Sequence, residues 1–265
     1  MSSLVFLKLG GSLITDKTRP YTPRLDILSD LAAQIASAFR EKPDLHLVLG
    51  HGSGSFGHTA ASLFKTHRGV IGPEGWRGFT EVWYQASLLN RLVVEALRQS
   101  GLPVVTLSPF SEVIAKDGQL KTWNLQFLKS ALAKGLLPVL HGDVVFDEMS
   151  GGTILSTEEL FSYLAHELHP SRILLAGLEE GVWAEFPERT HLLKEITPDG
   201  LHKQMPNVGK SAETDVTGGM LSKVTGMLAL VQEIPNLEVL IFSGQKPSAI
   251  HLTLLGDSIG TRLHC

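Results

Sequence analysis

Four glycines lie close together in the segment 49–58, which reads LGHGSGSFGH and follows an apolar run at Leu45–Leu49. Glycine adopts φ angles that other residues avoid, so such a segment can turn several backbone N–H groups toward one anion. A helix is expected from Thr59, and its N-terminus would add a partial positive charge at the same place. The segment therefore predicts a phosphate-binding loop.

Two histidines, His51 and His58, lie in this loop. A histidine beside a bound phosphate can donate a charge-assisted hydrogen bond, and its ordinary pKa of about 6.5 suits that task. A lone loop histidine is more often structural. His58 is the stronger candidate, because the glycines precede it and lysines elsewhere in the chain suit the same chemistry.

Two lysines near the start of the chain could bind phosphate. Lys8 lies at the end of a predicted buried strand, Leu4–Leu9, which runs into the turn Gly10-Gly11-Ser12. Ligands bind beyond the carboxyl ends of strands in open α/β sheets, and Lys8 is well placed for such a site. Taken alone, this motif is explained equally well by a solvated lysine at the end of the strand. Lys17 follows on a polar loop and, taken alone, reads as a surface residue.

Later motifs repeat this strand-to-turn pattern. A predicted strand at Leu136–Leu140 runs into His141-Gly142-Asp143, and another at 172–176 runs into a glycine turn at 177–182. A glycine-rich start at 215–220 leads into an amphipathic helix that carries Lys223. Ser156 and Glu159 form a capping-box pattern, which explains Glu159 but leaves Glu158 without a structural reason.

The elements that must position these residues alternate along the chain, which predicts a mainly parallel sheet with helices on both faces. Further strands are expected at Pro103–Leu107, Phe110–Ala115 and Glu238–Phe242, and a hairpin turn at 116–119. Helical spacing predicts helices over 26–39, 76–98, 125–132, 156–168 and about 220–231. The segment from about 183 to 207 is polar and irregular, and a short helix and a tail end the chain.

Composition excludes several classes of protein. The 265 residues carry a net charge of -4 without a basic stripe, so no nucleic-acid partner is expected. No apolar run is long enough to span a membrane and no signal peptide is recognised, so a soluble, cytoplasmic protein without a membrane partner is expected. Cys265 is the only cysteine, which excludes an internal disulfide or a cysteine-based zinc site.

Several motifs, in this order, resemble the amino acid kinase superfamily. They are Lys8 to Ser12, the glycine loop at 50–57, Ser156 to Glu159, and Asp215 to Lys223. Within the superfamily the chain is similar to the isopentenyl phosphate kinases, through residues 8–17, the SFGH ending of the loop, His141-Gly142-Asp143 and the run DVTGGM at 215–220. The likeness spans essentially the whole chain.

The resemblance implies a single domain, residues 1–265, with an α/β/α sandwich of amino acid kinase-like fold. An N-terminal lobe, about 1–150, would hold the phosphate acceptor, and a C-terminal lobe, about 151–265, would hold ATP and Mg²⁺. The reaction implied is phosphorylation of isopentenyl phosphate by ATP, in a homodimer. The chemistry of the motifs agrees, because phosphoryl transfer depends on positioning and charge stabilisation more than on a covalent nucleophile.

The resemblance also implies roles for individual residues. Lys8 would bridge the acceptor and the γ-phosphate, Lys17 would steady the γ-phosphate, His58 would bind the acceptor phosphate, Glu158 would organise the lysines, and Lys223 would act on the nucleotide side. No residue is predicted to ligate metal directly. The remaining acceptor-side candidates are Gly10, Gly11, Gly52, Ser53, Gly54, Gly57, Phe79, Trp83, Gly142 and Asp143; those on the nucleotide side are Ser12, Gly177, Gly181, Asp215, Thr217, Gly218 and Gly219, together with Lys8, Lys17 and Lys223.

Phe79 and Trp83 are candidates because aromatic side chains close to the phosphate loop could wall an apolar acceptor tail, although core packing is the commoner fate of such a stripe.

Three departures from the family pattern keep alternatives open. Ser53 replaces a usual glycine, Glu158 a usual aspartate, and Gly177-Leu178-Glu179 a usual Thr-Asp-Val near the nucleotide. The alternatives are a kinase for another small phosphate or phosphonate, such as fosfomycin, or a nucleotide-binding sensor or storage protein that has lost turnover.

Overall fold

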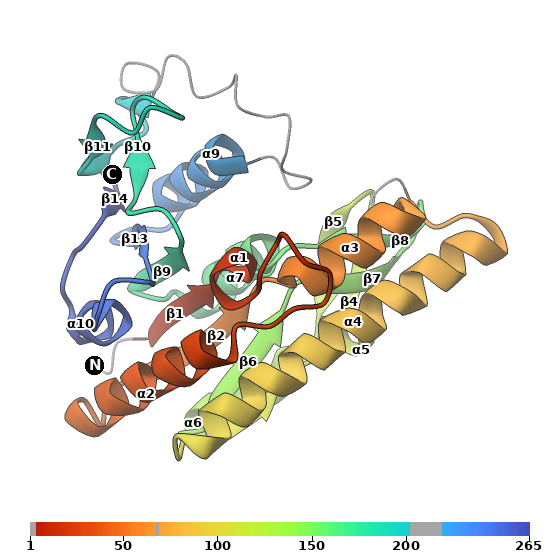
Figure 1. Cartoon of the computed structure of the whole chain (residues 1–265), viewed down its shortest axis with the longest axis horizontal. Helices are drawn as coiled ribbons and strands as arrows, with labels where there is room; N and C mark the ends of the chain where they lie inside the picture. Colours follow the sequence, from red (N-terminus) through yellow and green to blue (C-terminus); the bar gives the residue numbers. More distant parts are fainter. Residues whose placement is uncertain (1–3, 67–68, 202–218) are drawn as a thin grey trace.

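An eight-stranded sheet organises the chain in this computed structural model, which describes residues 4–66, 69–201 and 219–265. The strand order is β12-β14-β13-β9-β1-β2-β6-β3 (Figure 1). The strands are β1 (Leu4–Leu9), β2 (His46–His51), β3 (Val104–Thr106), β6 (Leu137–His141), β9 (Arg172–Gly177), β12 (Glu195–Ile196), β13 (Glu238–Ser243) and β14 (Thr261–Leu263).

The inner part of this sheet is parallel. β1 pairs in parallel with both β2 and β9, and β6 pairs in parallel with β2 and β3. β14 runs antiparallel to β13 near the other edge. The carboxyl ends of β1, β2, β6, β9 and β13 therefore share one edge of the sheet, where the predicted strand-to-turn motifs begin.

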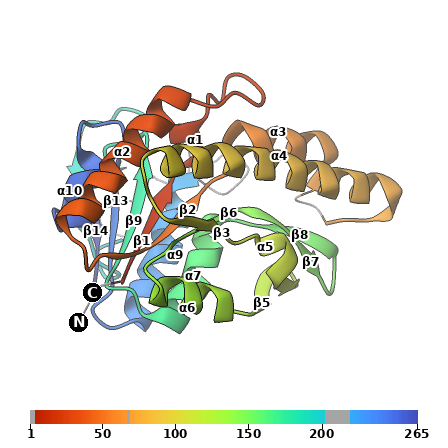
Figure 2. The ribbon, with the colours of Figure 1, turned by 90° about the horizontal axis from the view of Figure 1, so that it is seen from below.

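Helices cover both faces of the sheet, which confirms the predicted α/β/α sandwich (Figure 2). One face carries α1 (Gly11–Ile14), α2 (Leu25–Glu41), α3 (Gly54–Phe64), α4 (Gly72–Gln99) and α10 (Ala249–Leu255); the other carries α6 (Gln126–Ala133), α7 (Thr157–Leu168) and α9 (Gly219–Glu233). Apolar residues of α2, α7, α9 and α10 face the large sheet, because these helices are amphipathic. Part of α3 and of α4 packs instead against the smaller sheet.

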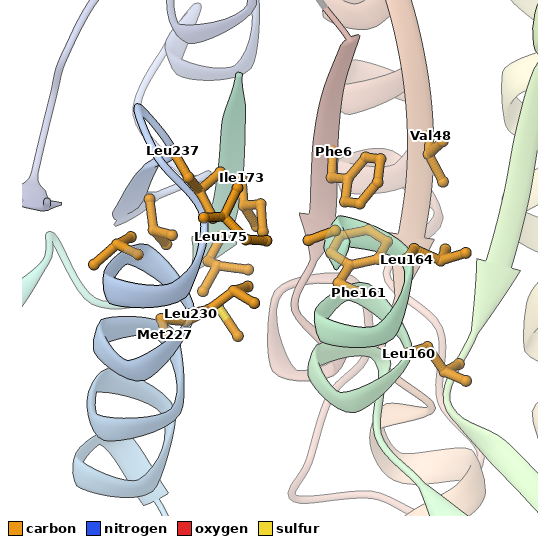
Figure 3. Packing of buried hydrophobic residues seen from close by; sticks show 14 of the residues in the cluster. Phe6, Val48, Leu160, Phe161, Leu164, Ile173, Leu175, Met227, Leu230 and Leu237 are labelled. Atoms are coloured by element: carbon orange, nitrogen blue, oxygen red, sulfur yellow. The ribbon is translucent and has the colours of Figure 1, made fainter. Parts of the chain in front are cut away.

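Two buried clusters fill the space between these layers. Alternate residues along a strand point to opposite faces, so Phe6 packs under α7 while its neighbours Val5 and Leu7 pack under α2. The rings of Phe6 and Phe161 lie 5.0 Å apart at the centre of the first cluster (Figure 3). Lys8 follows Phe6 by two residues, so the α7 side of the sheet also receives its side chain.

A smaller four-stranded sheet, of order β5-β4-β7-β8, lies beside α4 and α5 (Pro109–Glu112). Its strands are β4 (Val113–Lys116), β5 (Gln119–Trp123), β7 (Asp143–Asp147) and β8 (Gly151–Leu155). The β7–β8 hairpin was not predicted. A strand was predicted over 110–115, and its first half is wrong: Pro109 begins α5, and the strand begins only at Val113.

Other predicted elements are confirmed with small changes in their bounds. Helices 26–39 and 76–98 correspond to α2 and α4, and the turn between β4 and β5 carries positive φ angles at Asp117 and Gly118. The prediction of an irregular segment from about 183 to 207 was wrong in part: β11 (Leu192–Leu193) and β12 lie in it, and β10 (Val182–Trp183) lies at its start. β14 lies in the predicted tail. In the described part of the chain, no helix combines the length and the apolarity needed to cross a bilayer.

Candidate functional site

The predicted site residues converge because backbone hydrogen bonds extend the strand ladders into the turns. Gly10 N–H donates to the carbonyl of Ala176 at 2.8 Å, Gly52 N–H to that of Leu9 at 3.0 Å, and Gly142 N–H to that of His51 at 3.2 Å. The first residues beyond β1, β2 and β6 are thereby fixed side by side. The turns that follow β1, β2, β6 and β9 meet at one edge of the sheet.

Two glycine turns touch backbone to backbone at this edge. We call the contact between residues 10–11 and residues 52–54 the glycine junction. A Cβ built on Gly11 would lie 2.6 Å from Gly54 Cα, and one built on Gly52 would lie 2.8 Å from Gly11 N. No side chain fits at either position without moving the backbone, so the close contact between the two turns requires glycine at both positions.

The phosphate loop is shorter than predicted. Helix α3 begins at Gly54 and not at Thr59, so Gly54, Gly57 and His58 are helical residues. Gly54 has a φ of +50°, a conformation that glycine adopts readily, and it turns the chain directly from β2 into the helix. The N-terminus of α3 therefore lies in the predicted loop, where its partial positive charge favours an anion. Three of its backbone N–H groups already have protein partners, because Ser55 N–H donates to Thr15 Oγ1 and those of Phe56 and Gly57 donate to the Ser53 carbonyl. Ser53 is the N-cap residue, and its side chain lies over Gly57.

A buried threonine joins the glycine junction to the loop that carries Lys17. The Thr15 hydroxyl donates to the Gly11 carbonyl at 2.7 Å and accepts from Ser55 N–H at 2.9 Å. The Ser55 hydroxyl in turn accepts from Thr22 N–H at 3.2 Å, across the same loop. Lys17 itself is exposed on this braced loop. Neither hydroxyl was singled out from the sequence, since nothing local marks their partners.

Glu158 joins the two lysines that the sequence placed at the site. One carboxylate oxygen, Oε2, pairs with Lys8 Nζ, and the other, Oε1, lies 3.6 Å from Lys223 Nζ. We call this arrangement the lysine–glutamate bridge. Burial alone would raise the pKa of Glu158, but the charges of Lys8 and Lys223 outweigh it and lower that pKa to about 2. Glu158 is therefore ionised at neutral pH, and three site residues from β1, α7 and α9 act as one charged unit.

The start of α7 sets the position of Glu158. The predicted capping box is confirmed: Ser156 N–H donates to the Glu159 carboxylate at 2.6 Å, and Glu159 N–H donates to the Ser156 hydroxyl at 3.2 Å. These bonds satisfy the end of the helix without Glu158, whose carboxylate remains available to the lysines.

His51 does not serve as a charged phosphate ligand, contrary to the expectation raised for the loop histidines. Its ring is fully buried and stacks on His141, with ring centroids 5.3 Å apart. Burial and the neighbouring His141 lower the pKa of His51 to about 3, so the ring is neutral. Its Nε2 lies 3.1 Å from Asn90 Oδ1 on α4. His51 is an interior residue beneath the loop.

Two acceptor-side candidates follow β6. Asp143 is buried, its Oδ1 accepts from Val144 N–H at 2.8 Å, and its Oδ2 lies 3.4 Å from His141 Nε2. The Asp143 carboxylate therefore faces the interior beside the histidine pair. Gly142 lies at the edge of the site, where a Cβ would approach Thr157 N to 3.3 Å.

Phe79 and Trp83 belong to a cluster of five aromatic rings between α4 and the smaller sheet. Phe79 is 2% exposed and packs with Ala60 and Ala61, which follow His58 on α3. Trp83 is 37% exposed, and its ring lies 5.5 Å from that of Phe110. The other members of the cluster are Trp76, Phe110 and Phe146. Sequence analysis missed Phe110 and Phe146 because they lie on α5 and β7.

The predicted nucleotide-side residues are only partly described. Gly219 begins α9 with a φ of +67°, and no atom lies within 4 Å of the position a Cβ would take there. Gly177 ends β9 and is equally open, whereas a Cβ on Gly181 would lie 3.0 Å from Thr261 N. Ser12 lies in α1, which follows the glycine junction. Asp215, Thr217 and Gly218 lie outside the described residues.

Comparison with known proteins gives one consistent result. Residues 3–243 match the sequence model of the amino acid kinase family. The isopentenyl phosphate kinase of Methanocaldococcus jannaschii is 31% identical over 98% of each chain, and that of Methanothermobacter thermautotrophicus is 30% identical over 98% of each. A crystal structure of an isopentenyl phosphate kinase superposes with a TM-score of 0.83 at 28% identity, covering 98% of this chain and 99% of that one.

Proposed function

The chain belongs to the amino acid kinase family, and we propose from that premise that it transfers the γ-phosphoryl group of ATP to isopentenyl phosphate, forming isopentenyl diphosphate and ADP. The observation that carries the proposal is the lysine–glutamate bridge beside the glycine junction. It places fixed cations beside glycine turns and the N-terminus of α3 at one edge of the sheet, and fixed positive charge of this kind suits transfer between two phosphates. The identity of the acceptor rests on the full-length similarity to isopentenyl phosphate kinases.

The side chains at this edge suit an acceptor that is already an anion. A phosphate monoester needs no strong general base, so the carboxylate at the centre of the site serves another purpose. Glu158 holds Lys8 and Lys223 near each other, which offsets their mutual repulsion before substrates bind. Lys8 would stabilise the charge that grows between the two phosphates, and Lys17 would approach from the loop that Thr15 and Ser55 hold in place. His58 would bind the acceptor phosphate beside the positive N-terminus of α3.

ATP and Mg²⁺ fit the residues present. The start of α9 with Gly219 and Lys223, together with Gly177, would receive the nucleotide phosphates; among the described residues no group of three or more histidine, cysteine or acidic side chains could cage a metal. Mg²⁺ commonly binds through substrate phosphates and retains several waters, so it would enter with the nucleotide and neutralise phosphate charge. We assign the acceptor to an N-terminal lobe of about residues 1–150 and ATP to a C-terminal lobe of about 151–265.

The apolar end of the acceptor would lie against the cluster of α3, α4 and β7. Ala60, Ala61, Phe79, Val82 and Val144 are buried there directly beyond His58. Each buried methylene of an alkyl tail contributes about 0.8 kcal/mol, without any charged partner. Phe79 is the better candidate for the wall, because Trp83 lies farther out against Phe110.

A kinetic panel tests the proposal. ADP release is measured with isopentenyl phosphate, dimethylallyl phosphate, fosfomycin and acidic amino acids as acceptors. The proposal requires the highest kcat/KM with isopentenyl phosphate or its isomer, and Phe79→Ala should shift preference toward longer alkyl phosphates. Turnover of fosfomycin or of an amino acid alone would contradict it, and ATP binding without any turnover would favour a sensor or storage protein.

We also propose a homodimer in the cytoplasm. The outer face of α4 exposes Tyr84 and Leu88, four residues apart and therefore on one side of the helix. Exposed apolar side chains that gather on one helix face are typical of protein interfaces. Light scattering coupled to gel filtration should give twice the mass of one chain, whereas a monomeric mass would contradict the proposal.

A further inference from the structure

Thr157 lies directly before Glu158, at the first position of α7, and is 1% exposed. Its hydroxyl donates to the backbone carbonyl of His51 at 2.7 Å, which joins residues 106 positions apart. Gly142 N–H donates to the same carbonyl at 3.2 Å. A single carbonyl oxygen at the end of β2 therefore ties together the end of β6 and the start of α7.

The methyl group of Thr157 also fixes the start of α7. A Cβ built on Gly50 would lie 2.5 Å from Thr157 Cγ2 and 2.7 Å from Phe161 Cζ. The first turn of α7 therefore packs on the backbone of β2 with no intervening side chain. Both branches of the threonine side chain, the hydroxyl and the methyl, hold the helix to the strand that leads into the phosphate loop.

The Thr157 hydroxyl is not needed to cap the helix. Ser156 and Glu159 already satisfy each other's backbone N–H groups in the capping box. The Thr157 hydroxyl is thus a tertiary tether, and the residue that it precedes carries the carboxylate between Lys8 and Lys223.

We infer that Thr157 is a positioning residue for phosphoryl transfer: its hydroxyl fixes the backbone of Glu158 on the end of β2, so that one carboxylate spans both lysines. This inference rests on the proposed function, because it assigns a reason for the geometry of that same site. A displacement of about 1 Å at a catalytic group can cost as much as a hundredfold in rate. Loss of the tether should therefore lower turnover more than it weakens substrate binding.

The test compares variants that differ in one hydroxyl. Thr157→Val removes the hydroxyl and keeps the shape, and Thr157→Ser keeps the hydroxyl. Thr253→Val is the matched control, since Thr253 is a buried threonine on α10 whose hydroxyl donates to the Ala249 carbonyl at 2.8 Å. The Thr253 carbonyl accepts from Arg172, at the amino end of β9, far along the sheet from the site.

We expect Thr157→Val to lower kcat about tenfold with both KM values within about twofold, a loss well inside the hundredfold that misplacement can cause. Thr157→Ser should restore most of the rate, and Thr253→Val should lower Tm without changing kcat. In a Glu158→Gln background, Thr157→Val should have little further effect on kcat, because residues that act through one another are not additive. If Thr157→Val does not fold, Thr157→Cys, whose thiol is a weak donor, takes its place against Thr157→Ser.

The outcomes separate this inference from the function beneath it. An unchanged kcat in Thr157→Val, or an equal loss of kcat with and without Glu158, would overturn the positioning role while the kinase activity stands. A wild-type protein that does not phosphorylate isopentenyl phosphate would overturn the proposed function, and the inference with it.

Discussion

The glycine junction and the lysine–glutamate bridge both include residues at the end of β1, and they are built in opposite ways. The junction consists of backbone atoms brought into contact by residues that lack side chains. The bridge consists of three long charged side chains from β1, α7 and α9. Backbone donors hold their position through the sheet and helix ladders, whereas the bridge depends on the balance of two positive charges around one negative charge.

The difference predicts how each region fails. Added volume should damage the junction, and its function should be insensitive to pH because no titratable group forms it. Loss of charge should damage the bridge even where the fold is preserved. Substitutions that distinguish volume from charge can therefore separate the two regions.

Lys8→Ala should have the largest effect. Loss of one preorganised donor at a developing charge costs about two to three orders of magnitude in kcat, and we expect a loss of that size with a smaller change in ATP binding. Steady-state kinetics with both substrates measure it. Lys121→Ala removes a lysine that pairs with Glu148 on the hairpin and serves as the control. A loss of ATP affinity with unchanged turnover would contradict the role of Lys8.

Glu158→Gln should follow, with a fall in kcat of up to about a hundredfold, because the amide keeps the shape of the side chain but leaves two lysines without a counter-charge. The neighbouring Glu159→Gln is the matched control: glutamine also completes a capping box, so the rate should be preserved. If both variants keep the wild-type rate, Glu158 only stabilises the N-terminus of α7, and the bridge has no part in catalysis.

His58→Ala should raise the KM for the acceptor about tenfold or more, since a hydrogen bond to a charged group contributes about 1.5–3 kcal/mol. Tm should change little, because His58 is partly exposed on α3. His251→Ala, which removes a histidine that pairs with Glu41 on α2, should leave the kinetics unchanged. Identical KM values for the acceptor in wild type and His58→Ala would remove His58 from the site.

Gly11→Ala tests the junction by volume alone. A Cβ there would lie 2.6 Å from Gly54 Cα, and overpacking of this kind costs about 1–3 kcal/mol in the free energy of unfolding. The acceptor KM should rise with it. Gly226→Ala is the control: no atom lies within 4 Å of a Cβ there, on α9, and alanine should stabilise the helix by about 0.5–1 kcal/mol. Equal stability changes in the two variants would show that the junction is not tightly packed.

The smallest expected effect is the contribution of the lysine–glutamate bridge to the pH dependence of the free energy of unfolding. The pKa of Glu158 is lowered to about 2 in the folded chain, so the unfolded chain binds the proton more readily. The stabilisation is complete above the unfolded pKa of about 4.3 and is lost as pH falls through about 2. Denaturant unfolding between pH 5 and pH 2 should therefore be steeper with pH in wild type than in Glu158→Gln. Parallel curves would mean that the lysines do not lower the pKa of Glu158.

Local sequence patterns were enough to predict several of the elements that carry the lysine–glutamate bridge and the glycine junction. The strand that carries Lys8 and the capping box at Ser156 are local signals, and the structure confirms the elements that they predict. The prediction that α3 begins at Thr59 was wrong, because the backbone of Gly54 packs against Gly11 and turns directly into the helix. That contact joins residues from different strands and leaves no mark in either segment.

The hydrogen bonds and packing contacts that hold the site residues in place could not be predicted, because they too join residues far apart in the sequence. Thr157 and His51 are 106 positions apart, and their hydrogen bond exists only because β2 and β6 pair in a register that brings His51 beside His141. The β7–β8 hairpin was missed, and with it Phe146 in the aromatic cluster. Periodicity identifies which residues are buried, but long-range register decides which of them meet.

Phosphorus NMR of the reaction with ATP and an equimolar mixture of isopentenyl phosphate and fosfomycin tests the central claim most directly. The signals of each acceptor and product differ, so one spectrum series reports which phosphate receives the phosphoryl group. We predict loss of the isopentenyl phosphate signal and growth of two coupled signals from its diphosphate, with Glu158→Gln slower by the factor given above. Growth of a fosfomycin phosphate signal with isopentenyl phosphate intact, or ATP that persists unchanged, would contradict the account.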